Sequence, residues 1–294
     1  QIAPATIQLV SNDPNDAIES LGTVATTTGS ATFAGAKSII LRTRNARHDA
    51  TPGGSPDGWT VTASIFSGTS YNAGISTAIP VKGGPANRFM ALLPGETLEE
   101  GNVTTGGKLA GALPSQLAAG STYTVTVYAT DNSYNIDTAT NAFAILNFDP
   151  NGLQYDDPYA VAISTTQQLI NGTTAFQISF RVGESTSTGG FKDSRVVILS
   201  TANALTSVES SSARVMFSGG GARKGQILID SNESIQPGKP PYDYGLSGGD
   251  NGLSAGGKVQ NSPYPNVIAS RSSGEQFDVL IRVVDSYWNK VATH

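Results

Sequence analysis

The sequence predicts an all-β protein built from two β-sandwich units, and three observations lead to this class. The chain has 294 residues, which is enough for two domains of ordinary size. Its 33 glycines and 15 prolines, beside only 14% charged residues, are typical of many short strands joined by turns. Apolar and polar residues alternate in short runs, and no long segment has the 3.6-residue period of a helix.

Each predicted strand is a short apolar or alternating run bounded by Gly, Pro, Asn or Asp. In the clearest runs, every second residue is apolar and would face a core. These residues are Tyr123, Val125, Val127 and Ala129 in one run and Phe277, Val279, Ile281 and Val283 in the other. The remaining predicted strands are residues 7–10, 38–43, 60–66, 89–93, 143–148, 175–182, 195–200 and 226–229. A short helical turn is expected near residues 113–119.

The chain contains two copies of one unit, which a comparison of the sequence with itself reveals. Asp13-Pro14-Asn15 recurs as Asp149-Pro150-Asn151, and Gly83-Gly84-Pro85-Ala86 recurs at the same spacing as Gly219-Gly220-Gly221-Ala222. The alternating run recurs at a longer spacing, so the second copy carries a loop insertion, which we place near residues 239–262. The first unit would then be residues 1–140 and the second residues 141–294.

Three motifs of the first copy follow one another in a recognisable order. They are Leu92-Leu93-Pro94-Gly95-Glu96-Thr97, then Thr105-Gly106-Gly107-Lys108, then the run 123–131 closed by Asn132-Ser133-Tyr134-Asn135. The second copy keeps the last motif, in Asp285-Ser286-Tyr287-Trp288-Asn289, but not the Pro-Gly-Glu segment. In this order the chain resembles the tandem Ig-like repeats of very large bacterial cell-surface proteins. The resemblance implies two Ig-like β-sandwich units, an extracellular or cell-surface location, a structural or adhesive role and no enzymatic activity.

The resemblance also permits a second division of the chain. Taken in the order of the resembled domain, only residues 85–212 form a complete sandwich, and residues 213–294 and 1–84 look like complementary halves of another. A half sandwich exposes an apolar face and unpaired edge strands. We therefore expect it to be completed either by the other end of the same chain or by a neighbouring subunit.

Completion between subunits predicts a head-to-tail homopolymer, built by strand complementation as a filament, tube or surface layer. The partner would be another copy of this chain. The candidate assembly residues are Ala5, Thr6, Ile7, Gln8, Leu9 and Val10 near the N-terminus and Phe277, Val279, Ile281 and Val283 near the C-terminus. The alternative function is a surface adhesin or glycan-binding module, in which Tyr242, Tyr244 and Tyr264 of the insertion would stack on a sugar.

Acidic and amide side chains follow the run 123–129, and they have two interpretations. Asp and Asn can close a tight turn by bonding to the backbone two residues away. Alternatively, Asp131, Asn135 and Asp137 could supply oxygen ligands to Ca²⁺, the one cofactor that the sequence suggests. The turn is favoured because the second copy, with Asp285 and Asn289, has no counterpart of Asp137. Two further clusters are interpreted in the same way: Asp13, Asn15 and Asp16, and Asp149, Asn151, Asp156 and Asp157.

Charge and residue counts argue against several other functions. The net charge is −5 and the basic residues are scattered singly, so nucleic acid is not an expected partner. There is no cysteine for disulfides or thiolate metal sites. The two histidines, His48 and His294, lie in no Gly-x-Ser-x-Gly motif, so we do not expect an enzyme. No apolar run reaches the roughly 18 residues that suggest a membrane span.

Overall fold

The structure is a computed structural model that describes residues 5–16, 23–44, 58–68, 71–112, 117–147, 159, 161–182, 192–200, 209–216, 223–229 and 272–291. Within these residues the regular elements are strands, apart from the 3₁₀ helix η2 (Gly35–Lys37). The strands form several mainly antiparallel sheets, and the predicted all-β sandwich class is confirmed. No helix in this part of the chain is long and apolar enough to cross a bilayer.

An N-terminal sheet contains four strands in the order β2-β1-β3-β4. They are β1 (Ala5–Ser11), β2 (Thr23–Ala25), β3 (Val61–Gly68) and β4 (Gly74–Ile75). In the antiparallel pair of β1 and β3, Ile7 lies opposite Ile65 and Leu9 lies opposite Ala63. Because directly paired residues share one side of a sheet, this register gathers apolar side chains on one face.

A complete sandwich follows along the chain and consists of two sheets. One sheet has the order β5-β7-β11-β9, and its strands are β5 (Arg88–Leu92), β7 (Tyr123–Thr130), β11 (Thr173–Ser179) and β9 (Val161–Ala162). The other has the order β10-β8-β12-β13-β6, and its strands are β10 (Thr166–Gln168), β8 (Phe143–Asn147), β12 (Lys192–Ser200), β13 (Glu209–Met216) and β6 (Leu117–Ala118). Residues on both sides of position 140 contribute to this central sandwich.

The core of the central sandwich takes side chains from both sheets. Alternate residues of β7, namely Val125, Val127 and Ala129, are fully buried, as the two-residue period of the sequence predicts. The other members of the cluster are Phe89, Ala91, Leu93, Ala144, Leu146, Leu169, Phe176, Ile178 and Phe180. The burial of these core side chains can be compared with that of the equivalent side chains in the two end pieces.

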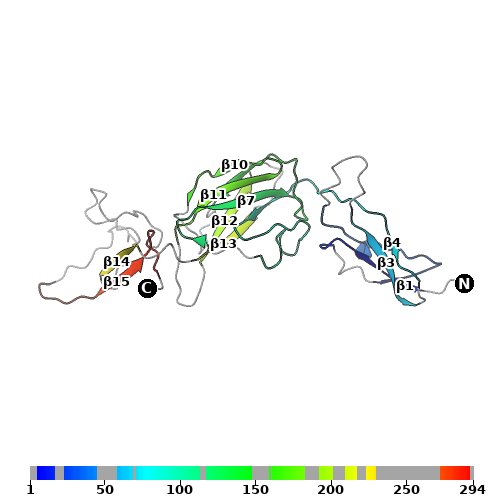
Figure 1. Ribbon diagram of the computed structural model, residues 1–294, viewed down its shortest axis with the longest axis horizontal. Coiled ribbons are helices and arrows are strands. Elements are labelled where there is room, and N and C mark those ends of the chain that lie inside the picture. The colour runs from blue at the N-terminus through cyan, green and yellow to red at the C-terminus, as the bar shows by residue number, and fades with distance from the viewer. Residues whose placement is uncertain are drawn as a thin grey trace.

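A two-stranded antiparallel sheet follows the central sandwich and consists of β14 (Lys224–Ile229) and β15 (Val279–Val284). We call this pair the hairpin, although a long segment of sequence separates its strands. Figure 1 shows the N-terminal sheet, the central sandwich and this hairpin in a row along the long axis of the molecule, with the sandwich in the middle. The two end pieces therefore lie on opposite sides of the central sandwich.

Two local predictions were wrong. Residues 38–43, predicted as a strand, pair with no strand in the described part of the chain. The backbone N–H groups of residues 42–44 instead donate hydrogen bonds to the side chains of Asp13 and Asn135. The helical turn expected near residues 113–119 is also wrong at its C-terminal end. There, Leu117 and Ala118 form β6 and pair in parallel with β13. The predicted insertion near residues 239–262 lies outside the described residues.

Candidate functional site

The C-terminal hairpin has the geometry of the β5-β7 pair in the central sandwich. The Asn87 N–H donates to Thr130 O at 2.9 Å, and the Arg223 N–H donates to Val284 O at 2.9 Å in the same position of the second copy. Ala91 pairs with Val127, and correspondingly Ile227 pairs with Ile281. The hairpin thus has the same local register as the β5-β7 pair.

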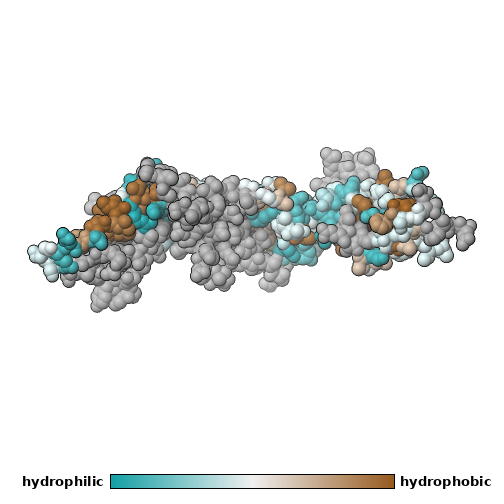
Figure 2. All heavy atoms as spheres, turned by 90° about the horizontal axis from the view of Figure 1, so that it is seen from below, coloured by the Kyte–Doolittle hydropathy of each residue, from teal (hydrophilic) through white to brown (hydrophobic). Residues whose placement is uncertain are grey.

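The core-facing side of this hairpin is uncovered. Val125, Val127 and Ala129 of β7 are each 0% exposed, whereas their counterparts Val279, Ile281 and Val283 are 49%, 67% and 40% exposed. Ile227 of β14 lies on the same face and is also exposed. In Figure 2, apolar side chains gather at the hairpin end of the molecule. Among the described strands, none covers this face of the hairpin as the second sheet covers β5 and β7.

The N-terminal sheet has the strand order of the second sheet of the central sandwich. Its order β2-β1-β3-β4 matches β10-β8-β12-β13, the sheet that faces β5 and β7 in that sandwich. A groove of about 270 Å³ opens on its apolar face, between β1, β3 and β4. The apolar and aromatic lining includes Ala5, Ile7, Ala63, Ile65 and Tyr71. Each end piece therefore presents the apolar face that the other would cover in a complete sandwich.

Asp131 closes a tight turn at the end of β7. Its Oδ1 accepts hydrogen bonds from the Ser133 and Asn135 N–H groups at 2.8 and 2.9 Å, and Tyr134 has a positive φ of 63°. Its Oδ2 accepts from the Gly84 N–H at 2.8 Å. The turn interpretation of the Asp-x-x-aromatic-Asn pattern is confirmed.

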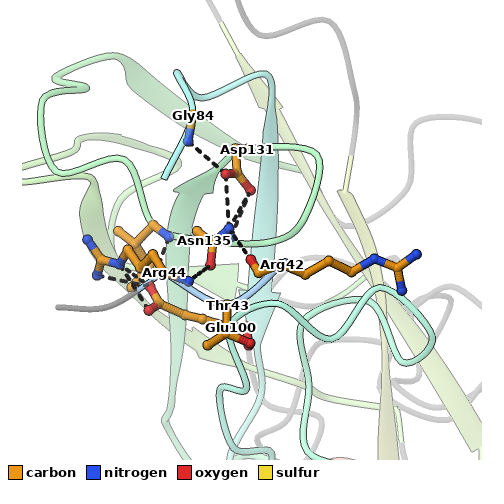
Figure 3. A network of polar contacts seen from close by, with 8 residues as sticks. Arg42, Thr43, Arg44, Gly84, Glu100, Asp131 and Asn135 are labelled. Atoms are coloured by element: carbon orange, nitrogen blue, oxygen red, sulfur yellow. Dashed lines mark hydrogen bonds and ion pairs between the residues drawn. The ribbon is translucent and has the colours of Figure 1, made fainter. Parts of the chain in front are cut away.

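This turn also binds the N-terminal piece, in what we call the N-terminal junction: residues 13, 15 and 42–44 against residues 83–84, 100–101, 131 and 135. Asn135 Nδ2 donates to Arg42 O at 2.9 Å, and Asn135 Oδ1 accepts from the Arg44 N–H at 2.9 Å. Figure 3 shows Asn135 between Asp131 and this segment. One amide side chain thus bonds to the backbone of the segment as a neighbouring strand would.

A charged pair reinforces the N-terminal junction. Arg44 Nε donates to Glu100 Oε2 at 2.9 Å and Arg44 Nη2 lies 2.9 Å from Glu100 Oε1, and both side chains are largely buried. Glu100 Oε1 also accepts from the Ile136 N–H at 2.9 Å. Because a bidentate arginine–carboxylate pair fixes orientation as well as distance, these contacts position the N-terminal piece on the central sandwich.

A second junction repeats this arrangement at the other end. Asn289 Nδ2 donates to Arg181 O at 3.0 Å, and Asp285 Oδ2 accepts from the same amide at 2.9 Å. The Arg181 guanidinium lies 4.6 Å from the centroid of the Tyr287 ring. The Tyr287 ring covers Gly120, where any Cβ would collide with it. We call Gly120, Arg181, Asp285, Tyr287 and Asn289 the C-terminal junction.

The two junctions lie at opposite ends of the central sandwich. Asp131 follows the C-terminal end of β7, whereas Arg181 follows β11, whose Ile178 pairs with Tyr123 at the start of β7. The eight residues of β7 separate these points by about 25 Å at the usual rise of a strand. The hydrogen bonds of the two junctions therefore fix the N-terminal sheet and the hairpin at opposite ends of the central sandwich, as Figure 1 also shows.

Two carboxyl groups near the junctions have shifted pKa values. Burial raises the pKa of Asp285, and this effect outweighs the hydrogen bonds from Asn289 and Tyr287 and the charge of Lys224. Burial of Asp137 acts in the same direction, but it is outweighed by bonds from Thr140, Ala86 and Ala139 and by Arg44. These opposing contributions leave the pKa of Asp137 lowered.

Calcium is expected to leave the melting temperature unchanged. The oxygens of Asp131 and Asp137 already accept hydrogen bonds from backbone N–H groups, which a cation would have to displace. The described residues contain no group of three His, Cys, Asp or Glu side chains placed to hold a metal. Thermal unfolding with millimolar CaCl₂ and with EDTA checks this. A higher melting temperature with CaCl₂ that vanishes in Asp137→Asn would instead support a calcium site.

The predicted assembly residues form two separate groups. Ala5 is buried, Thr6, Ile7, Gln8 and Leu9 are half-buried, and Val10 is exposed. Phe277, Val279, Ile281 and Val283 are all exposed at the other end of the molecule. Tyr242, Tyr244 and Tyr264, and the cluster from Asp149 to Asp157, lie outside the described residues.

Sequence reasoning missed the junction residues Arg42, Arg44, Glu100 and Arg181. One signal could have shown part of the arrangement: Ile39-Ile40-Leu41-Arg42 is similar to Ile178-Ser179-Phe180-Arg181, and in each case the arginine carbonyl accepts from the turn asparagine. Glu100 carries no such signal, because its contacts join residues far apart in the chain.

No family model matches the sequence, and no curated protein matches it. Among solved structures, a glycosyl hydrolase family 2 member from Bacteroides cellulosilyticus is 10% identical over 73% of this chain and 22% of its own, with a TM-score of 0.28. A β-glucuronidase from Parabacteroides merdae is 12% identical over 71% of this chain and 21% of its own, also with a TM-score of 0.28. The chain spans about a fifth of the length of these proteins, and likenesses this distant carry no functional inference.

Proposed function

We propose that this chain is an extracellular structural subunit that assembles head-to-tail. The β14-β15 hairpin of one copy and the N-terminal sheet of the next form one Ig-like sandwich by strand complementation. The observation that carries the proposal is the burial contrast between Val127, at 0% exposure, and its counterpart Ile281, at 67%. The β5-β7 pair and the β14-β15 hairpin are equivalent, but only the β5-β7 pair is covered by a second sheet among the described strands. The sheet that covers β5 and β7 is therefore the pattern for the partner of the hairpin.

A second copy is the occupant that the chain itself specifies. The missing sheet must have the strand order of β10-β8-β12-β13, and the N-terminal sheet has the matching order β2-β1-β3-β4. The two junctions hold the hairpin and this sheet on opposite sides of the central sandwich, so one chain does not bring its own halves together. We infer that a second molecule supplies the sheet.

The contact joins two different surfaces of the same protein, so it is heterologous. Such a contact repeats at every added copy and gives a filament, a tube or a layer unless it closes into a ring. Burying the four exposed side chains of the hairpin face favours association by about 1 kcal/mol or more each. We place the function in assembly rather than catalysis, because neither histidine occurs in a nucleophile motif.

Replacing Ile281 by aspartate is expected to abolish assembly while leaving the monomer folded. The side chain is mostly exposed in the single chain, but in the complete sandwich it would place an unpaired charge in the core. The control is Ile163→Asp, at a position of the central sandwich that is 82% exposed and belongs to neither face of the proposed contact. Light scattering and negative-stain electron microscopy report the size and shape of the particles.

The expected result is filaments, tubes or sheets for the unmodified chain and for Ile163→Asp, and monomers for Ile281→Asp. Monodisperse single chains of the unmodified protein at high concentration would overturn the proposal. Polymers of Ile281→Asp indistinguishable from those of the unmodified chain would overturn it as well, because the hairpin face would then not lie in the contact.

A further inference from the structure

Residues 39–41 form an apolar segment without a hydrogen-bonding partner. In the described part of the chain, none of the backbone N–H and C=O groups of Ile39, Ile40 and Leu41 makes a hydrogen bond. Ile40 is exposed, and Ile39 and Leu41 are only half-buried. Unpaired backbone groups beside apolar side chains are the features of a strand edge that can accept another strand.

The corresponding segment of the central sandwich shows what such a partner would be. Ile178 and Ser179 lie at the end of β11, where Ile178 pairs with Tyr123 of β7 and both residues pair with β9. Ile178 and Phe180 are fully buried there. The Gly120 N–H also donates to Phe180 O. In the second copy Gly120 and Tyr123 correspond to Gly274 and Phe277, which lead into β15, and β15 pairs only with β14 among the described strands.

Residues 42–44 are held by side chains, although no strand in the described part of the chain pairs with them. Asp13 Oδ2 accepts from the Arg42 and Thr43 N–H groups at 2.6 and 3.0 Å. Trp59 Nε1 donates to Thr43 O at 2.6 Å. Asn135 satisfies Arg42 O and the Arg44 N–H at 2.9 Å each. These side chains make hydrogen bonds to the backbone of residues 42–44 that a neighbouring strand would make in a sheet. The backbone of residues 39–41, which comes directly before, has no such partner among the described residues.

We propose that residues 274–277 of a second copy, which lead into β15, pair with residues 39–41, and that Asp13 and Asn135 are positioning residues that hold this segment in place before the partner arrives. The inference rests on the proposed head-to-tail assembly and specifies its docking strand. Ordering a strand costs conformational entropy, so a segment ordered in advance associates faster and more tightly. The N-terminal junction thus prepares one face of the contact between subunits.

Replacing Asn135 by alanine is expected to slow elongation about tenfold, since the Arg42 and Arg44 backbone groups lose their partner. The matched control is Asn141→Ala, in which an exposed asparagine of the same sandwich is truncated and elongation stays unchanged. A second variant, Asp13→Asn, tests the same segment without altering the central sandwich. Its amide has one acceptor oxygen for the N–H groups of Asn15, Arg42 and Thr43, so it too should slow elongation.

Mixing variants shows on which end Asn135 acts. Asn135→Ala keeps an intact hairpin, and Ile281→Asp keeps an intact segment 39–41. At concentrations too low for Asn135→Ala to bind itself, the two should form dimers at the affinity of the unmodified contact. Asn135→Ala together with a double Asn135→Ala/Ile281→Asp chain should bind about tenfold more weakly. Analytical ultracentrifugation measures both affinities.

Failure of this inference differs from failure of the proposed function. If the unmodified chain forms no polymer, the function is wrong. If it polymerises and Ile281→Asp does not, but Asn135→Ala and Asp13→Asn both elongate at the unmodified rate, the docking strand is wrong and head-to-tail assembly stands. Equal affinities in the two mixtures would also overturn the inference, because Asn135 would then not act through residues 39–41.

Discussion

Replacing Phe176 by alanine is expected to lower the free energy of unfolding of the central sandwich by about 3–5 kcal/mol. Phe176 lies in β11 and is fully buried in the core shared by the two sheets. It pairs with Val125, which is equally buried. Truncation removes apolar contacts and leaves a cavity that these neighbours cannot fill without moving the sheets together.

The matched control is Phe143→Ala in β8 of the same sandwich, where the ring is 45% exposed and its loss should cost less than about 1 kcal/mol. Both changes are made in the Ile281→Asp background so that assembly contributes nothing. The two tryptophans, Trp59 and Trp288, lie outside the central sandwich, so native-state hydrogen exchange at the Val125 and Val127 amides is the suitable measurement. Equal costs at the two positions would show that β11 does not pack in a closed core.

Strands with regular alternation were well predicted from the sequence. The run 123–129 forms β7 almost residue for residue, and the runs 89–93 and 143–148 form β5 and β8. In each case, local hydrophobic period and tertiary burial agree, so the pattern alone is informative. β13, with the sequence Glu209-Ser-Ser-Ser-Ala, has no such period, and only its pairing with β12 makes it a strand.

The segment 38–43 shows why sequence patterns cannot settle every strand. Its composition is that of a buried strand, and its counterpart β11 is one. A strand also needs a neighbour to receive its hydrogen bonds, and for this segment no described strand of the same chain supplies one. The pattern therefore indicates a capacity for pairing, which this single chain leaves unused.

The candidate site was predictable only in part, for a related reason. The apolar residues of the run 277–283 could be read from their alternation, and the repeat indicated that they belong to an incomplete unit. The N-terminal junction depends on contacts such as Glu100 with Arg44 and Asp13 with Arg42, which join turns far apart in the sequence. Acidic residues in turns look alike in a sequence whether they cap a turn locally or also bind a distant segment.

Replacing Gly101 by alanine is expected to open the N-terminal junction. Gly101 has φ of 84°, and a Cβ there would lie 2.8 Å from Thr43 Cα and N, besides colliding with its hydroxyl. Backbone cannot rotate away as a flexible side chain can, so residues 42–44 must shift and lose their bonds to Asp13 and Asn135. Protection of the Arg42, Thr43 and Arg44 amides from hydrogen exchange should fall by about tenfold or more.

Gly111→Ala separates this effect from backbone strain. Gly111 has a similar φ of 80°, but a Cβ there would meet no atom within 4 Å, so alanine incurs only the left-handed penalty of about 1–2 kcal/mol. Trp59 offers a second probe, since its indole N–H donates to Thr43 O and its fluorescence should change in Gly101→Ala alone. Unchanged exchange and fluorescence in Gly101→Ala would mean that Thr43 does not pack on this glycine. Residues 42–44 would then be held by their hydrogen bonds with Asp13, Trp59 and Asn135 alone, without a packing contact at Gly101.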